Sequence, residues 1–266
     1  MDKALKSVLD WWDAAGVDVP DVTLPVMRKQ KAAPSRKAPA PSASRASAPR
    51  ASTPSPSVSR ASAPRASAPK PAIDAGPIAA KAKTLAALKT AMDSFDAGTL
   101  SDAARQCVFA RGNPEADLMV IGEAPGREED IAGKPFIGPA GQLLDKMLAS
   151  IGLNEQSAYL TTVVNWRLPK NRNPTAEDIA LRAPFLQRHI ELAAPKVILL
   201  VGGTALTAMT GLSGIMKNRG QWQSVDIAGT EIQALPLYHP TTLIKQPVLK
   251  KEAWRDLLAL RERLRA

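Results

Sequence analysis

The sequence predicts an α/β domain in which a mostly parallel, four-stranded sheet is covered by helices on both faces. Four short runs rich in Val, Ile and Leu alternate with longer stretches whose apolar residues recur at helical spacing. The strand-like runs are apolar at most positions, which is typical of strands buried on both faces. Both observations favour a three-layer αβα arrangement.

The predicted elements follow one another in a regular order after a first helix at Ala79 to Asp93. The four strands are Asp117 to Ile121, Tyr159 to Val164, Val197 to Val201 and Gln233 to Tyr238. The later helices are Gly141 to Ile151, Thr175 to Ala194, Gly203 to Thr210 and Lys250 to Arg265. Sheets of this kind bind ligands beyond the carboxyl ends of their strands, so the loops there are where chemistry is expected.

The chain before residue 78 has a different character. Residues 1–20 hold apolar positions at helical spacing, which predicts a short amphipathic helix that either binds another protein or packs on the main domain. Residues 28–77 are mostly Ala, Pro, Ser and Arg, and Ser44–Ser52 is nearly repeated at Ser59–Ser67. This composition predicts a disordered linker. The folded domain is therefore expected over residues 78–266.

The net charge of +10 belongs to this linker. The basic residues lie between positions 28 and 70, a stretch with no acidic residue, and are Arg28, Lys29, Lys31, Arg36, Lys37, Arg45, Arg50, Arg60, Arg65 and Lys70. Outside residues 28–70, Lys and Arg balance Asp and Glu. The linker is either a cationic tether that follows nucleic-acid phosphates without reading sequence or a solvated spacer.

Cysteine content and hydropathy exclude several classes of protein. Cys107 is the single cysteine, so it makes no internal disulfide and cannot alone hold a structural zinc or an iron–sulfur cluster. No apolar run approaches the roughly 18 residues of a membrane span. We expect a monomeric cytoplasmic protein associated with the nucleoid and no membrane partner.

A glycine-rich loop follows the first predicted strand. It runs from Gly122 to Asp130 and continues from Gly133 to Gly141. Its glycines allow close backbone approach to a ligand, and the helix that begins near Gly141 favours anions. A planar ring and a phosphate would suit this loop. The acidic run Arg127 to Asp130 is interpreted as a solvated turn or helix start rather than a metal site.

A second loop, Tyr238 to Pro247, follows the last predicted strand. His239 at the strand end can hydrogen-bond a carbonyl or an anionic leaving group. The apolar pair Leu243 and Ile244, beside Lys245, could wedge into a stack of bases.

The two loops together resemble the uracil-DNA glycosylase superfamily, most closely its family 4. Its GEAPG…ED, GxPFVGxAGxLLDxML and HPAYLLRxP patterns are similar to Gly122–Asp130, Gly133–Leu148 and His239–Pro247, and the likeness covers about Phe95 to Leu264. It implies a monofunctional hydrolase of base excision repair that flips uracil out of DNA and cuts its N-glycosidic bond, leaving an abasic site. The alternative is a protein that binds uracil or abasic sites in single- or double-stranded DNA with little turnover.

The resemblance also implies roles for residues of both loops. Phe136 would stack on the flipped uracil. Glu123 would orient water or hold the geometry, and backbone N–H groups at Gly122 and Glu123 would bind uracil O2, with support from His239. Ala124 stands where other superfamily members have a water-activating aspartate, so catalysis would depend on stabilising the leaving group. Glu123 and His239 are thus the expected catalytic residues.

The expected DNA contacts extend around this site. Leu243, Ile244 and Lys245 would fill or flank the gap left by the flipped base, while Arg167 and Arg219 would contact phosphates. The full set is Gly138, Gly141, Gln142, Arg167, Arg219, Leu243, Ile244 and Lys245.

Two departures from family 4 change the expected chemistry. The family holds a [4Fe-4S] cluster on four cysteines, but the matching positions here are Gly98, Trp166 and Arg182, and Cys107 matches none, so no cofactor is expected. The family's base-reading Asn is replaced by Thr162, whose hydroxyl is less directional than an amide. Asn165 is a second candidate for reading the base edge.

Overall fold

The computed structural model describes residues 74–98 and 102–265. The expected N-terminal helix and most of the expected linker lie outside the described residues. Helix α2 spans Ala75–Lys81 and begins with Asp74, whose Oδ1 accepts a hydrogen bond from Gly76 N at 2.9 Å. The first described helix therefore includes residues 75–77, which the sequence assigned to the end of the linker.

The described residues form one six-stranded sheet with the order β1-β3-β2-β4-β6-β5. The strands are β1 (Arg111–Gly112), β2 (Leu118–Gly122), β3 (Ala158–Thr162), β4 (Val197–Val201), β5 (Gln223–Ile227) and β6 (Thr230–Leu237). The central four are parallel, as expected, whereas β1 and β5 pair antiparallel at the edges. The two edge strands were missed because β1 has two residues and β5 alternates with exposed polar residues.

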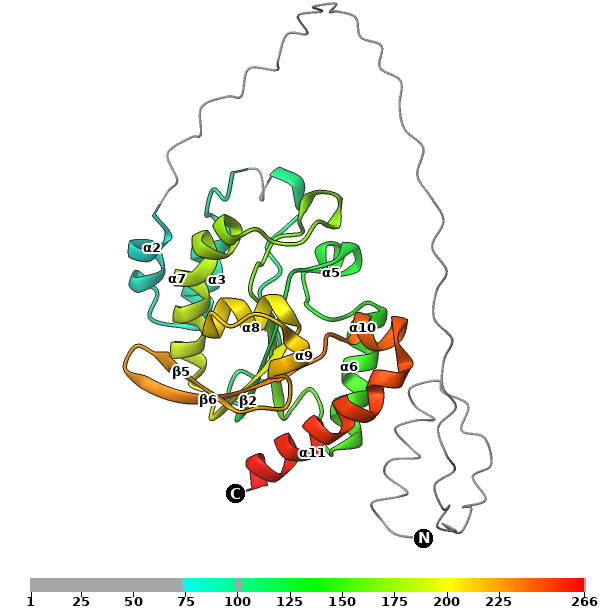
Figure 1. The fold of residues 1–266 in the computed structure, drawn as a ribbon. Coiled ribbons are helices and arrows are strands. Elements are labelled where there is room, and N and C mark those ends of the chain that lie inside the picture. The colour runs from blue at the N-terminus through cyan, green and yellow to red at the C-terminus, as the bar shows by residue number, and fades with distance from the viewer. Residues whose placement is uncertain (1–73, 99–101, 266) are drawn as a thin grey trace, which may run out of the picture. The chain divides into compact units, whose positions relative to one another are not determined.

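Helices cover both faces of the sheet (Figure 1). On one face lie α2, α3 (Leu85–Asp93), α7 (Ala176–Ala193) and α8 (Gly203–Thr210). On the other lie α6 (Pro139–Ser150), α10 (Pro240–Lys245) and α11 (Lys250–Arg265). The remaining short elements are α5 (Arg127–Ala132), α9 (Ile215–Asn218) and the 3₁₀ turns Pro169–Asn171 and Pro247–Leu249. The three-layer αβα prediction is confirmed.

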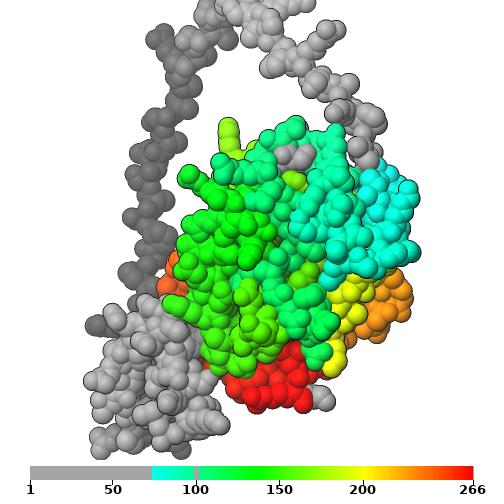
Figure 2. Space-filling model, turned by 180° about the vertical axis from the view of Figure 1, so that it is seen from behind, coloured from blue at the N-terminus to red at the C-terminus, as the bar shows by residue number. Residues whose placement is uncertain are grey.

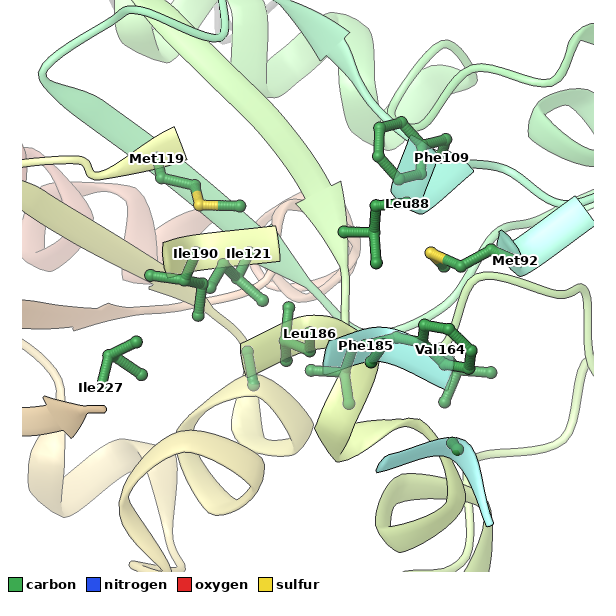
Figure 3. Close-up of a cluster of buried hydrophobic side chains, with 14 of the residues drawn as sticks. Leu88, Met92, Phe109, Met119, Ile121, Val164, Phe185, Leu186, Ile190 and Ile227 are labelled. Atoms are coloured by element: carbon green, nitrogen blue, oxygen red, sulfur yellow. The ribbon is translucent and has the colours of Figure 1, made fainter. Parts of the chain in front are cut away.

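The central strand β2 shows why the layers form. All five of its residues are buried, and successive side chains point to opposite faces. Met119 and Ile121 join the apolar cluster beneath α7, where Figure 3 shows them with Phe185 and Ile190. Leu118 and the β2 side chain that points to the same face join the other apolar cluster, beneath α6 and α11. Each fully buried side chain of this size contributes about 1.5–3 kcal/mol.

The helix expected over Ala79 to Asp93 is two helices. The chain leaves α2 at Ala82, and Thr84 caps α3 because its Oγ1 accepts a hydrogen bond from Ala87 N at 3.1 Å. Arg188 on α7 donates from Nε to the Ala82 carbonyl at 2.9 Å. The break therefore lets both helices pack on α7.

Figure 2 shows the molecule from behind, with the cyan residues of α2 and α3 at one side and the red residues of α11 at the lower edge. None of the helices in the described residues is long and apolar enough to cross a membrane.

Candidate active site

A cavity of about 320 Å³ lies at the carboxyl ends of the parallel strands. The loop after β2, the end of β3, the start of α6 and the start of α10 surround it. Its lining residues are Glu123, Ala124, Pro125, Gly126, Arg127, Glu128, Glu129, Phe136, Gly138, Pro139, Ala140, Thr162, His239 and Thr241. The fold thus brings together the two loops that the sequence singled out, although Gly141, which ends the first, and Tyr238, which begins the second, are far apart in the chain.

Phe136 forms one wall of the cavity in an uncommon backbone conformation. Its φ of 56° lies in the left-handed region, which costs energy for a residue with a side chain. Arg111 holds this turn, because its Nε donates to Pro135 O at 2.9 Å and its Nη2 donates to Phe136 O at 3.1 Å. Gly141 is required there, since a Cβ would collide with the Phe136 carbonyl. The turn places the ring against Gly122, where any side chain would strike it.

Glu129 joins the two halves of the glycine-rich loop. Its Oε2 accepts from Gly126 N at 3.0 Å, and its Oε1 accepts from Ile137 N at 3.1 Å and from Gly138 N at 2.9 Å. Such a carboxylate satisfies three backbone donors that would otherwise lack partners. The acidic run begins a helix, α5, which is one of the two expected alternatives, but Glu129 is bonded to the loop and Asp130 is buried, so these two carboxylates are not solvated.

His239 faces Phe136 across the cavity, with ring centroids 6.5 Å apart. Its Nδ1 accepts a hydrogen bond from Thr241 N at 3.2 Å, at the beginning of α10. Burial lowers the pKa of His239, while the carboxylates of Glu123 and Glu129 oppose this shift. The neutral ring therefore carries its proton on Nε2, because Nδ1 is an acceptor.

Glu123 lines the cavity just after β2 and is fixed from one side. Thr204, near the beginning of α8, donates its hydroxyl proton to Glu123 Oε2 at 2.5 Å. The backbone carbonyl of Glu123 accepts from Val164 N at 3.0 Å, which extends the pairing of β2 and β3 beyond the strands. The second carboxylate oxygen, Oε1, has no hydrogen bond to any described residue.

The structure distinguishes between the two residues expected to read a base edge. Thr162 lines the cavity and donates its hydroxyl proton to Val164 O at 2.9 Å, so its oxygen offers the cavity an acceptor. Asn165 is buried away from the cavity lining, and its Nδ2 donates to Val108 O at 3.0 Å. Asn165 therefore fixes the segment before β1 and does not reach the site.

Several expected DNA contacts lie elsewhere. Arg219 is paired with Asp256 and Glu252 on α11, with its Nε 2.7 Å from Asp256 Oδ2, so it is not available to a phosphate. Leu243 is fully buried under α10 and cannot enter a base stack. Gly141 is buried against the Phe136 carbonyl, and its expected contact with DNA stays a prediction.

The other expected contacts remain at the surface. Ile244 is 48% exposed at the tip of α10, and Lys245 beside it is exposed. Gln142 is exposed on α6, and Gly138 lines the cavity. Arg167 lies at a second hollow, which Arg127 shares with the main cavity.

The positions aligned with cluster cysteines do not suit an iron–sulfur cluster. Arg182 is fully buried, with its guanidinium carbon 3.2 Å from the centroid of the Trp166 ring and 4.9 Å from that of Phe95. Burial lowers the pKa of Arg182 to about 9 and raises that of Cys107 to about 12, so Arg182 is cationic and Cys107 a thiol at neutral pH. Among the described residues, no three His, Cys, Asp or Glu side chains are grouped to hold a metal.

Sequence reasoning missed Arg111, Glu129 and Thr204. A carboxylate three residues after Gly126 is the pattern of a capped helix start, so Glu129 was open to prediction. Nothing in the local sequence around Arg111 or Thr204 indicates their partners, which lie 24 or more residues away in the chain.

These features define a class of protein: an α/β domain that encloses a small cavity, walled by an aromatic ring and a neutral histidine, at the carboxyl ends of its parallel strands. The profile of the uracil DNA glycosylase superfamily matches residues 109–258, more than half of the chain. The chain therefore belongs to the uracil DNA glycosylase superfamily, and its relatives place it in family 4.

Three relatives support this assignment. The type-4 uracil-DNA glycosylase of Archaeoglobus fulgidus is 36% identical over 156 residues, which are 57% of this chain and 78% of that protein. That of Saccharolobus solfataricus is 34% identical over 191 residues, or 65% of this chain and 88% of the relative. The type-4 uracil-DNA glycosylase of Thermotoga maritima is 35% identical over 138 residues, which are 52% of this chain and 71% of that protein.

Proposed function

We propose that this chain is a monofunctional uracil-DNA glycosylase that flips uracil out of DNA and hydrolyses its N-glycosidic bond. The observation that carries the proposal is the cavity between Phe136 and His239, which has the walls that a planar base with a developing negative charge requires. Membership of the superfamily supports a role in DNA repair as a hydrolase.

The reaction separates the base from C1′ of the sugar. The C1′–N1 bond breaks, its electron pair remains on uracil as an anion shared with O2, a water oxygen forms the new bond to C1′, and the proton that this water loses balances the charge of the uracil anion. His239 donates a hydrogen bond from Nε2 to O2, where the charge develops, because its Nδ1 is already used as an acceptor. Phe136 supplies the stacking surface that holds the ring in place.

Glu123 would position the attacking water. Thr204 occupies Oε2, which leaves Oε1 to accept a hydrogen bond from water near C1′. No carboxylate side chain stands at Ala124, so leaving-group stabilisation carries more of the catalysis than a general base does. A slow enzyme that retains its abasic product is consistent with this balance.

Thr162 affects how well the cavity discriminates uracil from cytosine. Its oxygen can accept from N3–H of uracil, but it can equally accept from the exocyclic amine of cytosine, since its own proton is donated to Val164. We expect weaker discrimination between the two bases than an amide would provide. The same feature motivates the second candidate function, a protein that binds uracil or abasic DNA with little turnover.

We also propose that this chain works without the family's cluster. Trp166 and Arg182 are not thiolates, and their side chains stack on each other where ligands would be needed. None of the three guanidinium nitrogens has a hydrogen-bond partner among the described residues, so the aromatic rings supply the stabilisation of this cation.

Single-turnover release of uracil from a labelled DNA strand tests both proposals on one sample. Release by protein that has no visible iron–sulfur absorbance would support a cluster-free glycosylase. Tight binding of uracil or abasic DNA without release would replace it by the binding protein. A cluster band in the purified protein would overturn the second proposal.

A further inference from the structure

A second hollow of about 320 Å³ lies next to the cavity and is lined largely by arginine. Arg105, Arg127 and Arg167 surround it together with Asp130, Ala103 and Ile131. Arg127 also lines the main cavity, so the two share a wall. The sequence pointed to Arg167 alone, because Arg105 lies in a different segment and Arg127 in a run that resembled a solvated turn.

The three arginines around the hollow form no ion pair with a described residue, whereas four other arginines of the domain do. Arg111, Arg172, Arg188 and Arg219 each form an ion pair. Arg105, Arg127 and Arg167 form none with any described residue. Three arginines and one carboxylate, that of Asp130, line the same hollow, so positive charge is in excess there, and an anion would offset that excess.

Two further contacts shape the hollow. Asp130 is buried, and its Oδ1 accepts from the backbone N of Arg105 at 2.8 Å, so this carboxylate holds the Arg105 backbone at the hollow. Asn171 accepts from Arg167 Nε at 2.9 Å. The Nη1 and Nη2 groups of Arg167 have no partner among the described residues, so they can donate to a ligand.

We propose that Arg105, Arg127 and Arg167 form a subsite for one phosphodiester of the DNA strand that carries the uracil. The proposal rests on the proposed function, since a nucleotide whose base enters the main cavity brings its own backbone phosphates close to that cavity. Guanidinium groups match phosphate oxygens in charge and geometry. The subsite would position the strand without reading its sequence.

The test uses Arg105→Ala, Arg127→Ala and Arg167→Ala, singly and combined, in the full chain. The matched control is Arg265→Ala, an exposed arginine at the end of α11 far from α5 (Figure 1). The triple variant should bind a uracil-containing single strand at least about tenfold more weakly. The slope of log K against log salt should fall by about 0.7 for one lost phosphate contact. The control should match the wild type.

Replacing single phosphodiesters around the uracil by neutral methylphosphonates locates the contact. At one position the substitution should weaken binding by the wild type but leave the triple variant almost unchanged, since the two changes remove the same interaction. Equal effects on both proteins at every position would overturn the proposal. Binding of inorganic phosphate alone that the triple variant loses, without such coupling in DNA, would assign the hollow to a free phosphate and would also overturn it.

Uracil release in the same samples separates the two proposals. If the wild type releases no uracil but the coupling to one phosphodiester is present, the glycosylase function fails and the subsite stands. If release proceeds and the coupling is absent, the subsite fails and the glycosylase stands.

Discussion

The chain has two histidines, and they lie in regions with opposite properties. His239 sits at the ends of the strands and faces a cavity, with Nδ1 bonded to the backbone of α10. His189, on α7, is enclosed beneath the sheet, stacked on Phe109 at 4.3 Å and bonded through Nε2 to the Tyr159 hydroxyl at 2.9 Å. Burial lowers the pKa of both. The two histidines differ in the nitrogen Nε2. In His239 it has no hydrogen-bond partner among the described residues and the ring lines a cavity, whereas in His189 it is bonded to Tyr159.

The same contrast extends to the surroundings. Around His239 the polar groups hold loops in place and leave donors and acceptors facing the cavity. Around His189 the space is filled by the rings of Phe109 and Tyr159, and further along α7 the Arg182 guanidinium is likewise packed against an aromatic ring, that of Trp166. We therefore expect substitutions in the first region to change catalysis and those in the second to change stability.

The largest effect is expected for His239→Asn. Asparagine can still cap α10, but it removes the imidazole donor to uracil O2. Single-turnover uracil release should slow by about 100- to 1,000-fold with little change in the melting temperature. His189→Gln is the paired variant: it should lower the melting temperature by several degrees, roughly 1–2 kcal/mol, and leave release near the wild-type rate. Reversed outcomes would contradict the division between the regions.

Arg182→Ala should produce the largest loss of stability. Removing this fully buried side chain leaves a void among Trp166, Phe95 and Phe185, at a cost of about 3 kcal/mol in the free energy of unfolding. Arg182→Met keeps most of the volume without the charge and should cost under about 1.5 kcal/mol, or even stabilise. Chemical denaturation measures both. A methionine variant as unstable as the alanine variant would show that the cation itself, rather than its volume, holds this layer.

A smaller effect is expected for Glu129→Gln in the first region. An amide retains one acceptor oxygen, so part of the three-donor contact between the two glycine loops is lost. Uracil release should slow by about tenfold. Glu128→Gln is the comparison, because this exposed neighbour also lines the cavity but accepts none of these three hydrogen bonds, and it should slow release less. Equal effects at the two positions would point to a general loss of charge near DNA rather than to loop geometry.

The smallest effect is a dependence on pH. Since burial lowers the pKa of His239 below its ordinary value of 6.5, the neutral, active ring persists at pH 6.5 and is lost only as the pH falls through the lowered pKa. The release rate should decline in that range for the wild type, and the His239→Asn variant should lack this step. Each lowered histidine pKa also means that the unfolded chain binds more protons than the native protein below pH 6.5. Stability should therefore fall with pH there, down to about 3 for His189.

The sequence predicted the layers and the central strands well. The bounds of β4 and α8 match the prediction, because a run such as Val197–Val201 is apolar throughout and is bounded by glycine. The edges were missed, since Arg111–Gly112 is too short to carry a pattern. One expected helix is divided into α2 and α3 because Thr84 caps the beginning of α3. The break is held from α7, where Arg188 donates a hydrogen bond to the Ala82 carbonyl.

The candidate site was predicted in part. Glu123, Ala124, Phe136, Gly138, Thr162 and His239 were expected from their motifs, and all line the cavity. Asn165, Arg219 and Leu243 were expected beside them but are engaged elsewhere. A motif shows which residues belong to the site. It does not show which of them hydrogen-bond to residues of other segments, as Asn165 and Arg219 do.

By itself, the sequence determined the fold class, the order of the central elements and the two loops that carry the family's patterns, because local periodicity and short motifs encode them. Only the tertiary structure decided which nitrogen of His239 is free, that Glu129 joins the loops, that Arg182 lies against Trp166, and that three arginines share one hollow. Those properties depend on distances between residues far apart in the chain, and hydrogen bonds and ion pairs act only over a few ångströms.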